Sequence, residues 1–210
     1  MNKILLVFTL FSLFSFNSQA QDNYFPIKEK TLSIGGGASI RLNQTDYEAA
    51  LSREVFALNL RPNVGYAIGE NLMLGVGLGY SYNETTTDDS VNNRDQTANG
   101  VGVFPFIRKY FNINNRFALD LTGELGYEHS WGTNYTVGEG YESTANRFEA
   151  SIRPGISYFV SDHIALNAQL GGIFYQHTSR KVNGELDTRY NSLVASLQME
   201  QFYFGINFFL

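Results

Sequence analysis

The sequence predicts an all-β protein, an eight-stranded antiparallel up-and-down transmembrane β-barrel. Three observations predict it: apolar and polar residues alternate, short and long connections alternate, and glycine and aromatic residues are abundant. Of the 210 residues 20 are Gly, 15% are aromatic and only 17% are charged. Such a composition favours strands and is the reverse of that of disordered chains.

Composition also excludes several kinds of site. The chain has no Cys, which removes disulfides, Cys-ligated zinc and thiol nucleophiles, and its three His leave little for a His-based metal site. A net charge of −5 argues against nucleic-acid binding, which needs a basic face. We therefore expect no cofactor, no metal and no nucleic-acid partner.

Residues 1–20 have the pattern of a secretory signal peptide. Lys3 supplies a positive charge, an apolar run follows, and small residues stand at Ser18 and Ala20 before a cleavage site. The run is shorter than the roughly 20 apolar residues that span a bilayer as a helix. After cleavage following Ala20 we expect a short periplasmic N-terminal segment, residues 21–29, and then the barrel, residues 30–210.

Eight segments alternate with a period of two, which is typical of strands because successive side chains point to opposite faces. Each is about as long as the 9–11 residues with which a tilted strand crosses a bilayer. In the third segment the even positions hold Leu, Val or Tyr, and the odd positions hold Met, Gly, Ser or Asn. The segments are 31–42, 55–68, 72–83, 100–111, 117–131, 148–160, 164–175 and a last one that ends at Leu210.

Two of these segments depart from a clean alternation. In the fourth, Arg108 sets the polar face, so Phe104 and Phe106 must share that face. In the last, the apolar positions change parity near Glu200, where we expect a β-bulge.

The connections between segments alternate in length. Short turns at one end and long loops at the other are typical of an outer-membrane barrel, and an even strand number places both termini on the short-turn side. The sequence therefore predicts four extracellular loops. The short connections are 69–71, 112–115 and 161–163, and the long polar ones are 43–54, 84–99, 132–147 and 176–192.

Alternation alone does not say which face meets solvent. A soluble ligand-binding β-barrel would turn its apolar face inward, whereas a membrane barrel turns it outward. Here the polar face is crowded with Gly, Ser, Asn and charges of both signs, which suits a narrow interior, and aromatic residues gather at the ends of the apolar face, as interfacial girdles do. We favour the membrane barrel. The mean hydropathy of −0.19 then averages a lipid face and a polar interior.

These features together resemble the small outer-membrane β-barrel proteins of the OmpA/OmpX type. The resemblance rests on the signal peptide, the eight amphipathic segments, the terminal stretch Phe204–Leu210 and a proline in the second, fourth and sixth segments: Pro62, Pro105 and Pro154. Within a ladder such prolines are expected to mark a bulge or an unpaired site.

The resemblance implies a location in the bacterial outer membrane. It implies as partners outer-membrane lipid or lipopolysaccharide and, during biogenesis, the barrel-assembly machinery, with a monomer as the expected state. In such families the last strand is the assembly signal and usually ends in Phe, whereas this one ends in Leu. No peptidoglycan-binding domain follows, which resembles the OmpX subgroup. The residues of the implied signal are Phe204, Ile206, Phe208 and Leu210.

Eight charged residues fall on the expected interior face. Because an isolated buried charge is costly, they are expected to pair. Arg108 and Asp120 are near-opposite across a short turn, and Glu124 is expected at one level with two of the arginines. The sequence thus predicts an interior plugged by salt bridges, with a narrow pore as the alternative. The eight are Arg41, Arg61, Arg108, Arg153, Asp120, Glu124, Glu128 and Glu149.

One dipeptide raises the alternative of a membrane-embedded lipid-modifying enzyme. His129 and Ser130 invite comparison with lipid A deacylases, which are small outer-membrane barrels that use a His and a Ser. Adjacent residues on a strand face opposite ways, however, so His129 cannot activate Ser130 directly. We expect no catalytic residues, and a structural or surface-interaction role.

Overall fold

The computed structural model describes residues 27–47, 51–88, 94–136, 139–196 and 203–210. It consists of ten strands, and no helix in this part of the chain is long and apolar enough to span a membrane. The strands are β1 (Leu32–Tyr47), β2 (Leu51–Gly69), β3 (Leu72–Asp88), β4 (Arg94–Asn112), β5 (Phe117–Thr136), β6 (Glu139–Ser161), β7 (Ile164–Gln169), β8 (Gly172–Val182), β9 (Glu185–Ser196) and β10 (Tyr203–Phe209).

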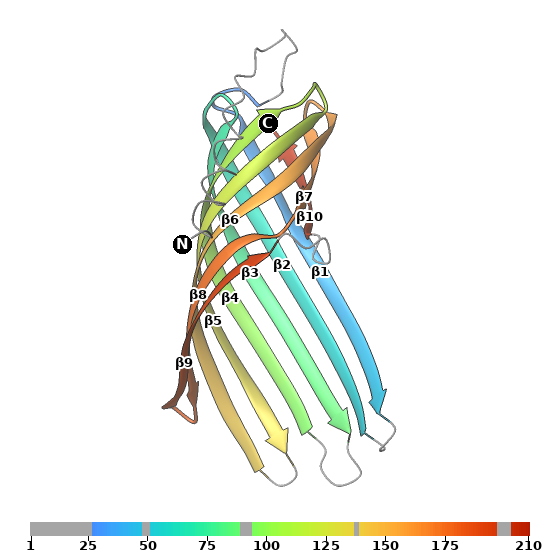
Figure 1. Ribbon diagram of the computed structural model, residues 1–210, viewed down its shortest axis with the longest axis vertical. Coiled ribbons are helices and arrows are strands. Elements are labelled where there is room, and N and C mark those ends of the chain that lie inside the picture. Colours follow the sequence, from blue (N-terminus) through green and yellow to red (C-terminus); the bar gives the residue numbers. More distant parts are fainter. Residues whose placement is uncertain (1–26, 48–50, 89–93, 137–138, 197–202) are drawn as a thin grey trace, which may run out of the picture.

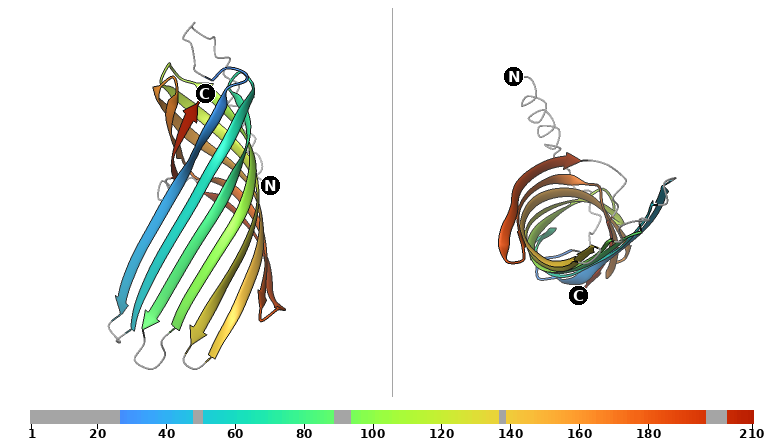
Figure 2. Two further views of the ribbon diagram at one scale, coloured as in Figure 1. Left: turned by 180° about the vertical axis from the view of Figure 1, so that it is seen from behind. Right: turned by 90° about the horizontal axis from the view of Figure 1, so that it is seen from below.

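Eight of these strands form a closed ring of hydrogen-bonded neighbours (Figures 1 and 2). The ring runs from β1 through β7 in chain order, and β10 closes it between β7 and β1. Every pairing is antiparallel. The expected all-β, up-and-down arrangement is therefore confirmed, but the expected count of eight strands is wrong, since β8 and β9 form an additional hairpin on β6.

The extra hairpin arises because the expected seventh strand breaks. Gly171 has a φ of 82°, in the left-handed region that glycine adopts readily. Before the break β7 pairs with β6 and β10, and after it β8 pairs with β6 and β9. Pro154 stands at the same break on β6, between the residues that pair with β8 and those that pair with β7.

The expected loop at residues 176–192 is instead the turn and flanks of this hairpin. Asn183 and Gly184 both have positive φ, 48° and 86°, as a two-residue type I′ turn requires. Asn-Gly is the dipeptide that favours this turn, so the ladder continues through residues whose polarity resembles that of a loop. The expected bulge near Glu200 lies outside the described residues.

The other three long connections are also mostly strand. β1 to β6 are 16 to 23 residues long, so the ladders continue through most of the stretches expected as loops at 43–54, 84–99 and 132–147. Beyond a bilayer both faces of a hairpin can be polar, so the alternation disappears while the backbone hydrogen bonds persist. The three short turns, by contrast, are where the sequence predicts them.

The prolines on β2 and β4 mark unpaired sites and not bulges. The β2–β3 ladder omits Pro62, and the β4–β5 ladder omits Pro105, but the register is the same on both sides of each gap. Proline has no amide hydrogen to donate, so the ladder lacks backbone hydrogen bonds at these positions while its register stays the same.

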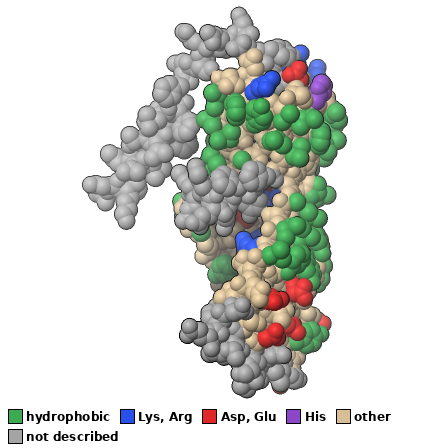
Figure 3. All heavy atoms as spheres, turned by 90° about the vertical axis from the view of Figure 1, so that its right-hand side faces the viewer, with side chains coloured by type: hydrophobic (Ala, Val, Ile, Leu, Met, Phe, Trp, Pro, Cys, Tyr) green, Lys and Arg blue, Asp and Glu red, His purple; other side chains and the backbone are tan. Residues whose placement is uncertain are grey.

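The apolar face of the ring points outward. Leu78 on the outward face is 60% exposed, whereas Thr122 on the inward face is fully buried. Phe104 and Phe106 are buried beside Arg108, as expected from their shared parity. Hydrophobic side chains cover much of the described face in Figure 3, with charged side chains gathered toward its two ends and a few visible at mid-height. This is the orientation expected of a membrane barrel.

An apolar cluster closes the short-turn end of the ring. It includes Ile27, which is 1% exposed and whose carbonyl accepts a hydrogen bond from the Asn71 amide at 3.3 Å. Lys30 donates its amide to Ala67 O at 2.8 Å, so the chain before β1 is tied to this end. The cluster comprises Ile27, Ala67, Met73, Phe106, Tyr110, Ala118, Phe159, Ala165 and Phe209.

The opposite half of β1 has a free edge. β10 pairs only with Ser33–Gly37, so from Ala38 to Tyr47 the only described partner of β1 is β2. β9 likewise pairs only with β8 among the described strands, and its tip projects sideways from the ring (Figures 1 and 2). Among the described strands, the wall is continuous only at the short-turn end.

The turn at Asn183–Gly184 provides a test of this fold. Gly184→Val places a β-branched residue at positive φ, which costs on the order of 1–2 kcal/mol. We expect faster amide hydrogen exchange in β8 and β9 and unchanged exchange in β2 to β5, measured by mass spectrometry. Ser192→Val, at an ordinary strand position of the same hairpin, is the control. Unchanged exchange in β8 and β9 of Gly184→Val would contradict the hairpin.

Candidate functional site

A carboxylate in the lumen binds two guanidinium groups. Glu124 on β5 accepts from Arg61 Nη1 on β2 at 2.9 Å and from Arg153 Nη2 on β6 at 2.5 Å, one arginine on each carboxylate oxygen. Its side chain is only 7% exposed. Since β2 and β5 are not neighbours in the ring, this Arg61–Glu124–Arg153 clamp crosses the lumen. It unites the three residues that the sequence places at one level.

Phe104 fills the lumen beside the clamp. The guanidinium carbon of Arg61 lies 3.8 Å from the centre of the Phe104 ring, a cation–π contact. The ring lies against glycines: a Cβ on Gly102 or Gly126 would come within 2.8 Å or 2.7 Å of its atoms. Glycine on the inward face is thus what makes room for an aromatic ring in so narrow a lumen.

The expected pair of Arg108 and Asp120 is a loose one. The residue directly opposite Arg108 is Thr122, whose hydroxyl accepts from Arg108 Nε at 2.9 Å. Asp120 is displaced diagonally, and its Oδ1 lies 4.0 Å from the same nitrogen. Both side chains are buried, so they interact electrostatically without forming a tight ion pair.

Asp120 is held instead by a chain of neutral polar groups that the sequence reasoning missed. Ser157 donates its hydroxyl to Asp120 Oδ2 at 2.8 Å, and Asn167 Nδ2 donates to Ser157 Oγ at 2.6 Å. Asn207 Nδ2 then donates to Asn167 Oδ1 at 2.7 Å. This chain of hydrogen bonds links β5, β6, β7 and β10 on the short-turn side of the clamp. Its members share the inward parity of their strands, a signal that was available in the sequence.

The two remaining interior glutamates have partners from stretches expected as loops. Glu128 pairs with Arg147 at 2.7 Å, and Glu149 accepts from Gln176 at 2.9 Å. Arg147 continues the inward parity of Glu149 and Arg153, but its place in an expected loop concealed it. The network therefore extends further toward the long hairpins than the sequence predicts.

Arg41 does not join this network. It lies on the inward side of β1 but is exposed, and it forms no ion pair with another described residue. The reason is its position on the half of β1 that has a free edge, where no described strand closes the wall beside it. The expected pairing of Arg41 in the interior therefore has no counterpart among the described residues.

The lumen contains a cavity of about 570 Å³ that extends to both sides of the clamp, since Phe106, Arg108 and Asn207 line it on the short-turn side. Among its lining groups are Glu128, Arg147 and Glu149 as well as the clamp itself. Two buried polar atoms in its wall, Arg153 Nε and Asn207 Oδ1, have no hydrogen-bond partner. Among the described residues no group of three or more His, Asp or Glu is placed to hold a metal ion.

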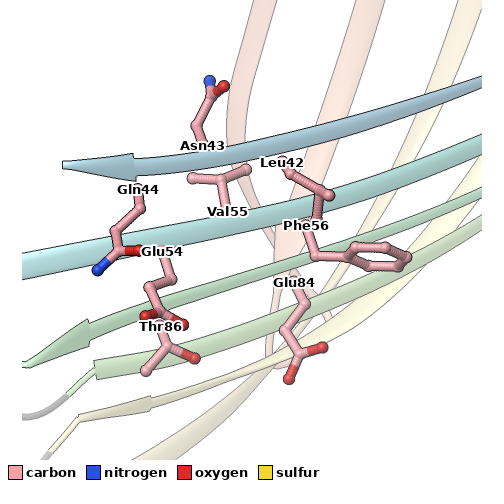
Figure 4. Close-up of a pocket in the computed structure, with 8 residues that line it drawn as sticks. All are labelled: Leu42, Asn43, Gln44, Glu54, Val55, Phe56, Glu84 and Thr86. Atoms are coloured by element: carbon pink, nitrogen blue, oxygen red, sulfur yellow. The ribbon is translucent and has the colours of Figure 1, made fainter.

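A second cavity, of about 420 Å³, lies near the outer ends of β1, β2 and β3 (Figure 4). Glu54, Glu84 and Thr86 point to the same side of the sheet there. They follow Phe56 and Tyr82 on the outward face, so the apolar surface ends at this level. The cavity marks that boundary, and its acidic side chains lie apart from the lumen network.

The pair that raised the enzyme alternative has no catalytic geometry. His129 faces outward and stacks on Trp131 at 6.0 Å, with its Nδ1 2.8 Å from Asn146 Oδ1. Ser130 faces inward, where its hydroxyl donates to Ala145 O at 3.5 Å. The strand separates the two side chains, as the parity argument predicts.

The C-terminal strand closes the ring. Leu210 exchanges backbone hydrogen bonds with Leu32, at 2.8 and 3.0 Å. Ile206, Phe208 and Leu210 are exposed on the outward face, while the side chain of Phe204 lies outside the described residues. The outward apolar row of the implied assembly signal is therefore present at its last three positions.

Comparison with known proteins assigns the family. The family described as outer membrane protein beta-barrel domain matches residues 6–199. The chain belongs to this family. As a member it is an integral protein of the bacterial outer membrane, in agreement with the resemblance to the OmpA/OmpX type. A search of curated proteins gives no match.

Solved structures of outer-membrane proteins are similar at low identity. The translocator domain of the autotransporter NalP from Neisseria meningitidis is 12% identical with a TM-score of 0.49, over 78% of this chain and 57% of that one. Neisserial surface protein A is 16% identical with a TM-score of 0.41, over 85% and 96%. Ail, the attachment invasion locus protein of Yersinia pestis, is 16% identical with a TM-score of 0.42, over 87% and 99%.

The clamp yields a prediction about stability. Glu124→Gln removes the counter-charge of Arg153, which is buried, and of Arg61, whose side chain is 35% exposed, and removing one partner of a buried ion pair such as Arg153–Glu124 costs about 3–5 kcal/mol. We expect the free energy of unfolding in urea, followed by fluorescence of the single Trp131 in lipid vesicles, to fall by about that amount. The control Glu139→Gln removes an exposed carboxylate and should change it by no more than about 0.5 kcal/mol. Equal effects of the two substitutions would refute the clamp.

Proposed function

We propose that this protein is a non-enzymatic outer-membrane barrel with a closed interior, which presents rigid β-hairpins to the outside in a structural or surface-interaction role. The observation that carries the proposal is the Arg61–Glu124–Arg153 clamp across the lumen. A bridge of two guanidinium groups and one carboxylate opposes the passage of ions, because its side chains are held by ion pairs across a narrow lumen and constrict it at this level.

A second barrier supports the closed interior. The apolar cluster that contains Ile27 lies at the short-turn end and bounds the cavity there, since its Phe106 side chain also lines the cavity. Tyr110 and Phe159 meet edge to face at 6.5 Å, and Phe159 lies 5.6 Å from Phe209. The cavity is therefore expected to be closed at the short-turn end and open toward the long hairpins, so that it does not form a continuous pore.

The extended strands support the role outside. On β2 the outward apolar row runs from Ile68 to Phe56, which at about 3.3 Å per residue and a tilt of about 40° gives a band about 30 Å tall. This is close to the ~25 Å band of outer-membrane barrels. The strands continue beyond it as paired, polar hairpins. Such a surface is rigid and suited to contact with a partner.

Lipid modification is less well supported by the geometry. Neither His129 nor His177 contacts a Ser or a carboxylate among the described residues, and each instead lies 2.8 Å from an Asn carboxamide oxygen. A nucleophile and a base within hydrogen-bond reach are what such chemistry requires.

Electrical recording tests the closed interior. In planar lipid bilayers the refolded protein is expected to give no stable conductance steps, under conditions in which a known porin gives them. The variant Ile27→Gly with Phe104→Ala removes a side chain from each barrier and should conduct more than the wild type. Migration in cold detergent before and after heating shows whether each protein has folded. Reproducible open channels in the wild type would overturn the proposal.

A further inference from the structure

A cluster of three polar side chains lies on the outward face of the β5–β6 hairpin. Tyr127 donates its hydroxyl to Asn146 Oδ1 at 2.9 Å, and His129 Nδ1 lies 2.8 Å from the same oxygen. His129 and Asn146 stand directly opposite each other in the ladder. With two donors on its carbonyl oxygen, the Asn146 amide directs both hydrogens of its nitrogen away from them.

The β8–β9 hairpin repeats this cluster. Tyr175 donates its hydroxyl to Asn191 Oδ1 at 3.1 Å, and His177 Nδ1 lies 2.8 Å from that oxygen. His177 and Asn191 are again directly opposite in the ladder. The amide nitrogen of Asn191 is therefore also turned away as a free pair of donors.

A third hairpin, β3–β4, carries a related pair. Tyr80 donates its hydroxyl to Asn99 Oδ1 at 3.1 Å, and Tyr82 takes the position opposite Asn99 that His occupies in the other two. Three of the hairpins on the long-connection side thus have a Tyr, an opposed His or Tyr, and an Asn in the same arrangement.

The three clusters lie at one level of the molecule. Tyr80 on β3 pairs through β4 with His129 on β5, which is two residues beyond Tyr127. Tyr127 on β5 in turn pairs through β6 with His177 on β8, which is two residues beyond Tyr175. This constant stagger is what tilted strands require of residues at equal height. On β3 the next outward residue is Glu84, so the level is the outer boundary of the apolar surface.

Cations distinguish the β8–β9 cluster from the other two. Arg189 is the next outward residue on β9 after Asn191, and Lys181 is the second on β8 after His177. Both are exposed, and neither forms an ion pair with a described residue. Of the acids near the turn, Asp187 lies 3.9 Å from Arg180, and Glu185 is exposed.

The corresponding positions of the other clusters carry no cation. In β3–β4 the next outward residues are Glu84 and Thr97, and in β5–β6 they are Trp131 and Thr144. Charge therefore differs around the outer boundary of the apolar surface: exposed cations lie there on β8 and β9, and an acid lies there on β3.

We propose that the outward face of the β8–β9 hairpin binds the phosphate of an anionic lipid in the outer leaflet. Arg189 and Lys181 pair with the phosphate, and the free amide hydrogens of Asn191 donate to it. Below them Leu193, which is 74% exposed, and Tyr175 lie against the acyl chains. This site rests on the proposed orientation, in which the long hairpins face outside.

Native mass spectrometry of the whole mature protein, released from detergent, tests the site. The probes are lipid A with both phosphates and the same lipid A after removal of its phosphates, each with and without excess inorganic phosphate. Lys181→Gln with Arg189→Gln removes the cations. The matched control is Lys109→Gln with Arg116→Gln, which removes the same charge at the short-turn end. A second pair, Asn191→Ala against Asn146→Ala, tests the amide without changing charge.

The wild type is expected to retain phosphorylated lipid A over the dephosphorylated form by on the order of tenfold, since each cation contributes to binding an anionic lipid. The Lys181/Arg189 variant should lose this preference, Asn191→Ala should weaken it, and both controls should keep it. Equal retention of the two lipids, an equal loss in the Lys109/Arg116 control, or displacement of the lipid by inorganic phosphate would overturn the proposal.

The result is independent of the closed interior. A protein that conducts but shows this lipid preference would overturn the proposed closed interior and leave the site intact. A closed protein without the preference would do the reverse. If the Lys181/Arg189 variant fails to fold, the Asn191 and Asn146 pair decides the question alone.

Discussion

The outward direction of the apolar face places the polar side chains of the other face inside a narrow ring, where most of their polar groups bind one another. Glu124 shows this constraint most clearly, because it forms ion pairs with two arginines from different parts of the ring, one on each oxygen. Burial of either arginine alone would be costly. The aromatic ring beside the clamp, the glycines that make room for it and the chain of polar groups around Asp120 all serve the same requirement.

The same constraint explains why the two ends of the molecule differ. At the short-turn end the ring is complete, and an apolar cluster that includes Ile27 replaces polar pairing. Toward the long hairpins no described strand except β2 pairs with β1, and Arg41 in that region is exposed. Outside the apolar band no face of a hairpin has to be apolar, so β1 to β6 continue as two-sided polar ladders.

Much of this was predictable from periodicity. Parity assigns the outward row and the inward position of Phe104, and counting residues from the short turns places Arg61, Glu124 and Arg153 at one level. Two kinds of feature were missed. A loop and a polar hairpin have similar composition, so Arg147 and the strand extensions were assigned to loops, although Asn183–Gly184 is a turn signal in its own right. The change of partners between β7 and β8 occurs at Gly171, and a single glycine in an alternating segment does not reveal it. The family and the membrane were within reach of the pattern, whereas the role outside the cell depends on partners that no pattern names.

The central claim, that the apolar face meets lipid and the polar face an enclosed lumen, has one direct measurement. Because the chain has no cysteine, single cysteines can be introduced along β3 from Leu74 to Tyr82 and spin-labelled in lipid vesicles. Collision with oxygen, which concentrates in lipid, is predicted to alternate with a period of two and to peak at the even-numbered positions, Leu74, Val76, Leu78, Tyr80 and Tyr82. Peaks at the odd-numbered positions, or no alternation, would contradict the account.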